Sequence, residues 1–214
     1  MRVINFQVAS GDRKSHTWNP FSTVNAEGMA ELLRTLFLPE KSQGGGNSEY
    51  FTNRASSLIG AMSKVFEWMR DHEGIPITAS TMRANFSDIQ ALIDLTRSQD
   101  DTNASRRFRY FDADTQKVVQ IALPDDFPEE MLHDIRYYVQ ETGGYSQKAG
   151  DADGQEKVRQ QHGFVIGGFA KTFMMMTTTY GHIFNCNVPD VELTDVIFNR
   201  RNLIVLLPSL ENDP

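Results

Sequence analysis

Apolar and polar residues follow a strand-like period at the two ends of this chain and a helical period between them. Residues 3–8 (VINFQV) alternate over most of their length, as a β-strand does. Residues 203–207 (LIVLL) form a short apolar run between Asn202 and Pro208, which is typical of a strand buried on both faces of a sheet. Two such strands cannot form a stable sheet alone, so their positions suggest that they belong to a larger one.

The middle of the chain predicts several amphipathic helices. The clearest stripe recurs at spacings of four and three and ends before Gly74. It consists of Phe51, Ala55, Leu58, Met62, Val65 and Met69. Asn25 is the expected cap of an earlier helix, Ser80 and Ser87 are expected to cap two short later ones, and Pro128 begins another.

The longest helix is expected at about residues 155–183. Its apolar positions follow steps of seven, four and three, and Gly167-Gly168 lies inside it. We interpret the two glycines as a point of close helix packing, with a hinge as the alternative.

A strand signal interrupts the helices at "RFRYFDADTQKVVQIAL", which alternates on both sides of Asp112-Ala113-Asp114. This pattern predicts a hairpin, and a helix through the whole segment is the weaker alternative. The order is therefore strand, helical body, strand. We predict a mainly α protein: an all-α bundle inserted in a larger α/β domain, with strand stubs at both ends that lie close together. The expected boundaries are 1–21 and 196–214 for the stubs and 22–195 for the helical domain.

Composition and charge make several classes of protein less favourable for this chain. The net charge of −7 does not favour a polyanion-binding protein. The single cysteine, Cys186, excludes an internal disulfide and favours a reducing compartment. No apolar run approaches the length of a membrane span, and no signal peptide pattern opens the chain.

No catalytic or metal-binding motif is complete in this sequence. "GGFAKTF" lacks the glycine before its lysine and lies in a predicted helix, where backbone N–H groups are not free to bind phosphate. Pro208-Ser209 stands where a magnesium-binding acid would follow the last strand. "GDADGQE" resembles the start of a calcium loop, but its ligand series stops after two aspartates. The histidines show no metal-ligand spacing, and Cys186 has no partner motif. We therefore expect no catalytic, cofactor-binding or metal site.

One cluster remains as a candidate for partner binding. Arg106, Arg107 and Arg109 alternate with Phe108 and Tyr110, a mixture that can hold phosphates, stack on bases or contact a protein. The alternative is an ordinary edge strand with a charged outer face. If Arg106, Arg107, Arg109 and Tyr110 bind a partner, they should be exposed, and reversing the three charges should leave the fold intact. The polar loop 150–156 is a second candidate surface.

Several segments in order resemble type IV coupling proteins, and within them the branch that includes the coupling ATPase of the Dot/Icm secretion system and its relatives in plasmid conjugation. They are "INF", "NPF", "VFEWMRD", "QHGFVIGGFAKTF", "TTTYGHIF" and "DVIFNRRNLIVLLPSLE". Each motif alone is weak, and their number and order carry the resemblance. The loops, residues 143–160 above all, depart from the pattern, which leaves the choice of partner open.

The resemblance implies a fragment of a membrane-anchored, homo-hexameric, RecA-like ATPase at the cytoplasmic face of the bacterial inner membrane. The phosphate loop and the magnesium-binding acid, and with them ATP and Mg²⁺, would belong to the parent protein outside this chain. The chain itself is then expected to be a monomer that makes no membrane contact and neither binds nor hydrolyses ATP. It would dock a substrate protein, a relaxase with its DNA, or an adaptor. An independent helical DNA-binding protein is the alternative, and a small enzyme is disfavoured.

Overall fold

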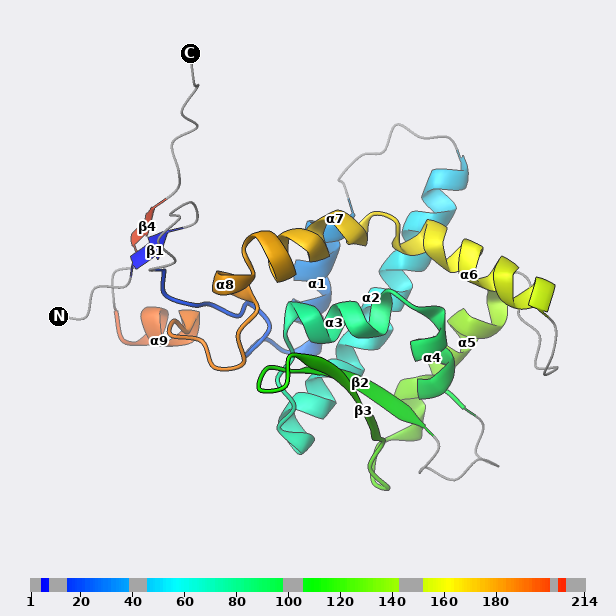
Figure 1. Cartoon of the computed structure of the whole chain (residues 1–214), viewed down its shortest axis with the longest axis horizontal. Helices are drawn as coiled ribbons and strands as arrows, with labels where there is room; N and C mark the ends of the chain where they lie inside the picture. The colour runs from blue at the N-terminus through cyan, green and yellow to red at the C-terminus, as the bar shows by residue number, and fades with distance from the viewer. Residues whose placement is uncertain are drawn as a thin grey trace, which may run out of the picture.

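The computed structural model describes residues 5–7, 15–38, 46–97, 106–142, 152–200 and 204–206. Over these ranges the protein is mainly helical, with one antiparallel hairpin and one short parallel strand pair (Figure 1). The predicted mainly α fold with a small hairpin is therefore confirmed. Among the described helices, none has the length and apolar character that a membrane span requires.

Helices α1 (Ala26–Phe37) and α2 (Gly46–Glu73) form the centre of the helical body. Asn25 caps α1 as predicted, because its side chain accepts a hydrogen bond from the backbone of Gly28 at 2.9 Å. The predicted stripe of α2 is buried from Ala55 to Met69, and Phe51 is partly buried. With 28 residues, α2 is the longest described helix.

The two short helices form as predicted, but their caps differ. In α3 (Ala79–Phe86) the cap is Thr78, and in α4 (Ile89–Leu95) it is Asp88. The predicted caps, Ser80 and Ser87, are wrong: Ser80 lies inside α3, and Ser87 has helical backbone angles at the end of α3. The extended backbone of Thr78 and Asp88 instead lets each side chain accept a bond from the first turn of its helix.

Strands β2 (Arg107–Asp112) and β3 (Lys117–Ala122) form the predicted antiparallel hairpin, in which Tyr110 pairs with Val119. Asp112 organises the turn, since its carboxylate accepts bonds from the backbone of Asp114 and the hydroxyl of Thr115. Phe108 is fully buried, and β2 packs against α3 and α4 (Figure 1). The hairpin therefore covers one side of the helical core.

The single helix predicted at residues 155–183 is wrong. This segment consists of α6 (Ala152–Ile166), α7 (Phe169–Met174), a π-helical turn at Met175–Thr179 (η3) and α8 (Gly181–Phe184). A Cβ on Gly168 would lie 3.0 Å from the carbonyl oxygen of Phe37 in α1. The break therefore occurs where α1 approaches closely, and the interpretation of the glycines as a close-packing point is confirmed for Gly168. A single turn at Glu129–Leu132 (η2) leads into α5 (His133–Glu141).

The terminal strands lie side by side, as predicted. β1 (Asn5–Gln7) pairs in parallel with β4 (Ile204–Leu206), in the register Phe6 to Val205. The pair lies at one end of the molecule, beside α9 (Leu193–Phe198) and apart from the hairpin (Figure 1). The boundaries predicted at residues 21 and 196 stay a prediction.

The chain leaves and re-enters the helical body through two adjacent segments. The side-chain nitrogen of buried Asn19 donates to the carbonyl oxygens of Ile77 at 2.9 Å and Cys186 at 3.1 Å. The backbone of Trp18 donates to Ile183, and that of Val191 donates to Thr17. The "WNPF" segment therefore ties the two ends of the helical body together, and its second half, Pro20 and Phe21, lies in a turn that the bond from the backbone of Ser22 to Asn19 closes.

Candidate docking surface

The predicted docking residue Arg106 is buried, with 3% of its surface exposed. Its Nε donates to the carbonyl oxygen of Arg97 at 3.0 Å, and its guanidinium pairs with Glu129. Arg136 donates to the same carboxylate at 2.7 Å. Burial tends to raise the pKa of Glu129, but the hydrogen bonds from Arg136 and Arg106 outweigh it and lower the pKa below its ordinary value. Arg106 therefore joins the start of the hairpin to η2.

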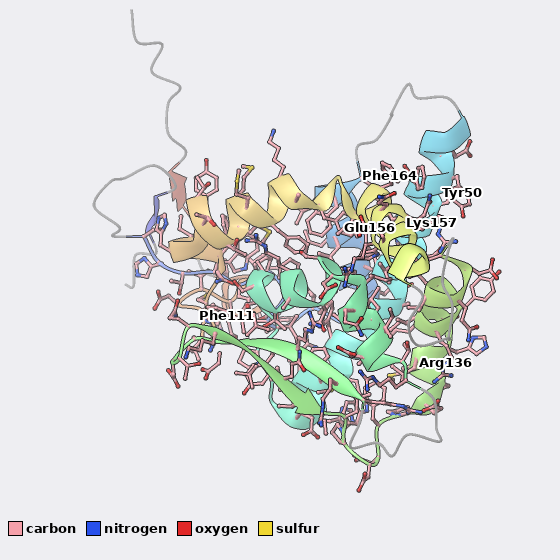
Figure 2. All side chains as sticks on the ribbon, turned by 45° about the vertical axis from the view of Figure 1, so that its right-hand side comes forward. Tyr50, Phe111, Arg136, Glu156, Lys157 and Phe164 are labelled. Atoms are coloured by element: carbon pink, nitrogen blue, oxygen red, sulfur yellow. The ribbon has the colours of Figure 1, made fainter. Side chains whose placement is uncertain are left out.

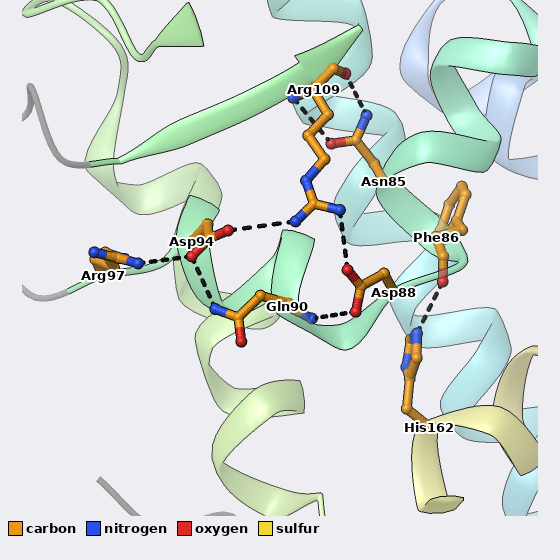
Figure 3. Close-up of polar contacts among 8 residues, drawn as sticks. All are labelled: Asn85, Phe86, Asp88, Gln90, Asp94, Arg97, Arg109 and His162. Carbon is orange, nitrogen blue, oxygen red and sulfur yellow. Dashed lines mark hydrogen bonds and ion pairs between the residues drawn. The ribbon is translucent and has the colours of Figure 1, made fainter. Parts of the chain in front are cut away.

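Arg109 forms a second internal network (Figure 3). Its guanidinium lies 3.0 Å from the carboxylate of Asp88 and 3.4 Å from that of Asp94. Asp94 also accepts bonds from Gln90 at 2.9 Å and from Arg97 at 2.8 Å. The network binds β2 to both ends of α4.

Asn85 adds a backbone contact to this network. Its side-chain nitrogen donates to the carbonyl oxygen of Arg109 at 2.6 Å, and its oxygen accepts from the N–H of Arg109 at 3.4 Å (Figure 3). The buried amide of Asn85 thus satisfies backbone groups of β2 that face α3 instead of a neighbouring strand.

Three of the predicted docking residues, Arg107, Arg109 and Tyr110, are partly exposed. Arg107 forms no ion pair with a described residue, and Tyr110 packs partly against the main core. The expectation that all three arginines are exposed is wrong for Arg106, which is buried. The side chain of Arg109 is only 15% exposed and pairs with Asp88 and Asp94. Binding of a partner by this segment stays a prediction. Among the four predicted docking residues, Arg107 is the charged one that is best placed to contact a partner.

The structure also places three other features that the sequence analysis considered: loop 150–156, Gly167-Gly168 and Cys186. Loop 150–156 belongs to α6 from Ala152 onward, and its earlier residues lie outside the described ranges. Gly167-Gly168, which begins the rejected phosphate-loop candidate "GGFAKTF", lies between two helices and not within one. The element before it is α6, whereas a phosphate loop follows a strand. Cys186 is partly buried, and this burial raises the pKa of its thiol, so the reactive thiolate is disfavoured.

A groove that the sequence did not predict lies between α1, α2 and α5, with a volume of about 930 Å³. Small residues of α1 and α2, among them Ala30, Ser57 and Gly60, line it together with larger polar ones. Tyr50 of α2 and Tyr137 of α5 are more than half exposed beside it (Figure 2 labels Tyr50). The helical stripes show which faces are buried, but not that three helices leave a groove where they converge.

No family model matches this chain. It is 31% identical over 222 aligned residues to the type 4 coupling protein DotL of Legionella pneumophila (strain Philadelphia 1), an alignment that includes 99% of this chain. The chain spans about a quarter of that relative, 26% of its length. The predicted resemblance to type IV coupling proteins is therefore confirmed, and this chain matches a segment of such a protein.

Proposed function

We propose that this chain is the cargo-docking segment of a type IV coupling protein and has no catalytic activity of its own. The observation that carries the proposal is the similarity to DotL along almost the whole chain. The cargo would be a relaxase with its DNA, an effector protein, or an adaptor that presents either. The parent protein would be a membrane-anchored, hexameric ATPase at the cytoplasmic face of the bacterial inner membrane.

The terminal strands support the idea that the helical body is an insertion in an α/β domain. Parallel strands occur almost only in sheets that helices cover on both faces, and a pair of three-residue strands is too small to be stable alone. Since Asn5–Gln7 and Ile204–Leu206 are adjacent and parallel, both would fit one larger parallel sheet. In this proposal ATP and Mg²⁺ bind to that larger domain, and the helical body serves recognition.

The contacts of the basic segment weaken the alternative of an independent DNA-binding protein. Arg106 and Arg109 are paired with carboxylates, so neither is free to neutralise a phosphate. With a net charge of −7, the chain lacks the excess of cations on which nucleic-acid affinity depends. If the alternative holds, duplex DNA should bind with an affinity that falls steeply as salt is raised.

Deleting the helical body from the parent protein tests the proposal. Joining Phe21 to Val196 removes the predicted domain and keeps both strands. Residues 8–21 and 196–203 still connect them, which satisfies the dozen or so residues that a parallel crossover requires. We expect the variant hexamer to turn over ATP at the rate of the intact protein and to transfer no cargo. Normal cargo transfer would refute a docking role, and loss of ATP turnover in a folded hexamer would refute a purely non-catalytic one.

A further inference from the structure

Arg54 stands at the groove between α1, α2 and α5 without an acidic partner among the described residues. Its guanidinium lies 4.9 Å from the ring centre of Tyr138 and 5.7 Å from that of Tyr50. It donates to the hydroxyl of Tyr50 at 3.2 Å, to the carbonyl oxygen of Tyr138 at 3.0 Å and to the hydroxyl of Thr142 at 3.2 Å. These uncharged groups fix the position of the guanidinium, and no carboxylate in the part of the chain that the structure describes compensates its charge.

The other cations of the groove are already paired. Arg34 lies 3.6 Å from the carboxylate of Glu31, and Lys64 lies 3.7 Å from that of Asp134. The groove also contains the carboxylates of Glu27 and Asp134. A polyphosphate backbone would meet these acids and find one uncompensated cation, so the lining does not suit a nucleic acid. It suits a ligand with a single carboxylate.

The rest of the lining fits a peptide chain. A volume of about 930 Å³ is near the upper end of the range for ligand sites. Small lining residues that are at least partly exposed, among them Ala26, Ser56 and Ser57, let a peptide backbone approach the helices closely. Exposed tyrosines such as Tyr50 and Tyr137 offer rigid contact area to apolar side chains and a hydroxyl to polar ones. Tyrosine and arginine are the residue types in which binding energy concentrates at interfaces.

We propose that this groove binds an extended peptide segment of a partner protein, and that an acidic side chain of the segment pairs with Arg54. The inference rests on the proposed function, because it supplies the chemical class of the docked segment. Arg54 would hold the carboxylate, and Tyr50 and Tyr137 would contact the residues on either side of it. A charge-assisted arginine–carboxylate bond is among the stronger single contacts available to such a site.

Selection of peptides tests the inference without knowledge of the natural partner. The probe is a phage-displayed library of random peptides, each about twelve residues long, selected against the intact chain. We expect the selected sequences to share an aspartate or glutamate. Replacing that acid by its amide should weaken binding about tenfold or more, as the loss of a charge-assisted bond does. Failure to select any peptide, or selection without a shared acid, would overturn the inference.

Two variants, each with a matched control variant, test whether the peptide binds in this groove. Arg54→Met should weaken binding of the acidic peptide about tenfold and leave the amide peptide unaffected, whereas Lys171→Met, which removes one exposed charge on α7, should change neither. Ser57→Glu puts a competing carboxylate on the exposed wall of the groove and should abolish binding, while Ser57→Gln should preserve it. If Arg54→Met does not fold, the comparison of Ser57→Glu with Ser57→Gln still tests the inference. Full affinity in Ser57→Glu would overturn the inference.

A labelled duplex DNA that binds wild type but neither Arg54→Met nor Ser57→Glu would overturn the peptide assignment in favour of a nucleic acid. The inference of peptide binding in the groove and the proposed docking function can be refuted separately. If no acidic peptide binds and cargo transfer still requires residues 22–195, only the groove is wrong. If cargo is transferred without residues 22–195, the docking function is wrong whatever the peptides show.

Discussion

The Nε2 atom of His162 lies 2.8 Å from the carbonyl oxygen of Phe86, and this contact fixes the tautomer of a buried imidazole (Figure 3). Since a carbonyl oxygen can only accept, Nε2 carries the hydrogen. Nδ1 therefore accepts a hydrogen bond from the hydroxyl of Tyr138, at 2.8 Å. Neutral His162 thus joins α6 to the end of α3 and to α5.

This arrangement makes the stability of the fold depend on pH. Burial lowers the pKa of His162 below its ordinary 6.5, although the bond to Phe86 opposes the shift. The unfolded chain therefore binds more protons below pH 6.5 than the folded one. The contribution of His162 is complete above pH 6.5 and is lost as the pH falls toward the lower folded value. Denaturant unfolding between pH 8 and pH 5 should show this decline.

The variant His162→Gln should lose less stability over that range than wild type. His133→Gln, which changes an exposed histidine, should follow wild type. A wild-type decline equal to that of His162→Gln would mean that other groups are responsible.

The ion pair of Arg106 gives a second prediction. Arg106→Ala removes the buried guanidinium that holds Glu129, and hydrogen bonds to charged groups are worth about 1.5–3 kcal/mol each. We expect the free energy of unfolding to fall by about that amount. Arg107→Ala, next to it but partly exposed, should stay within about 0.5 kcal/mol of wild type. Equal effects would contradict the division of the arginines into internal and surface ones.

These arginines show the limit of reading charges along a sequence. The local pattern of residues 106–110 predicts a strand, and the strand forms. The carboxylates that neutralise Arg109 come from positions 15 and 21 residues away, and Glu129 is 23 residues from Arg106. No local period relates such distant charges. Whether a cation faces solvent or an internal acid therefore depends on packing that the pattern does not specify.

The helical stripes are more informative, because burial of apolar area alone determines which face points inward. Phe169, one of the apolar positions in the stripe predicted at residues 155–183, is 1% exposed. The helix boundaries between residues 155 and 183 were not predictable, since the break depends on the approach of α1, which is distant in sequence. The groove at Arg54 could not be predicted either, because it forms where helices that are distant in sequence converge.

Phe169 packs within a cluster of rings, 4.6 Å from the ring centre of Phe37 and 5.6 Å from that of Phe86. Phe169→Ala should lower the free energy of unfolding by about 3–5 kcal/mol, because it removes the transfer energy of the ring and leaves a cavity. Phe164→Ala, at a position 63% exposed, should cost much less. A loss below about 1 kcal/mol for Phe169→Ala, measured by chemical denaturation, would contradict the packing.

The close approach at Gly168 can be tested with a single methyl group. Gly168→Ala places a Cβ 3.0 Å from the backbone oxygen of Phe37, which cannot move without shifting α1. We expect a loss of about 1–3 kcal/mol, typical of overpacking. Gly163→Ala in α6 meets nothing within 4 Å and should instead stabilise the helix, by up to about 1 kcal/mol. If both changes stabilise the protein, the break between α6 and α7 is not a packing contact.

The last prediction concerns Arg107, the charged candidate contact that the internal networks leave at the surface. If the hairpin contacts cargo or an adaptor, Arg107→Glu in the parent protein should reduce transfer severalfold, because like charges across an interface repel and mispaired charges cost affinity. The fold and the ATP turnover should not change, since the side chain pairs with no described residue. Lys117→Glu, an equal change of charge at an exposed position of the same hairpin, is the control. Normal transfer by Arg107→Glu at normal abundance would show that β2 is an ordinary charged edge and that the docking surface lies elsewhere on the helical body.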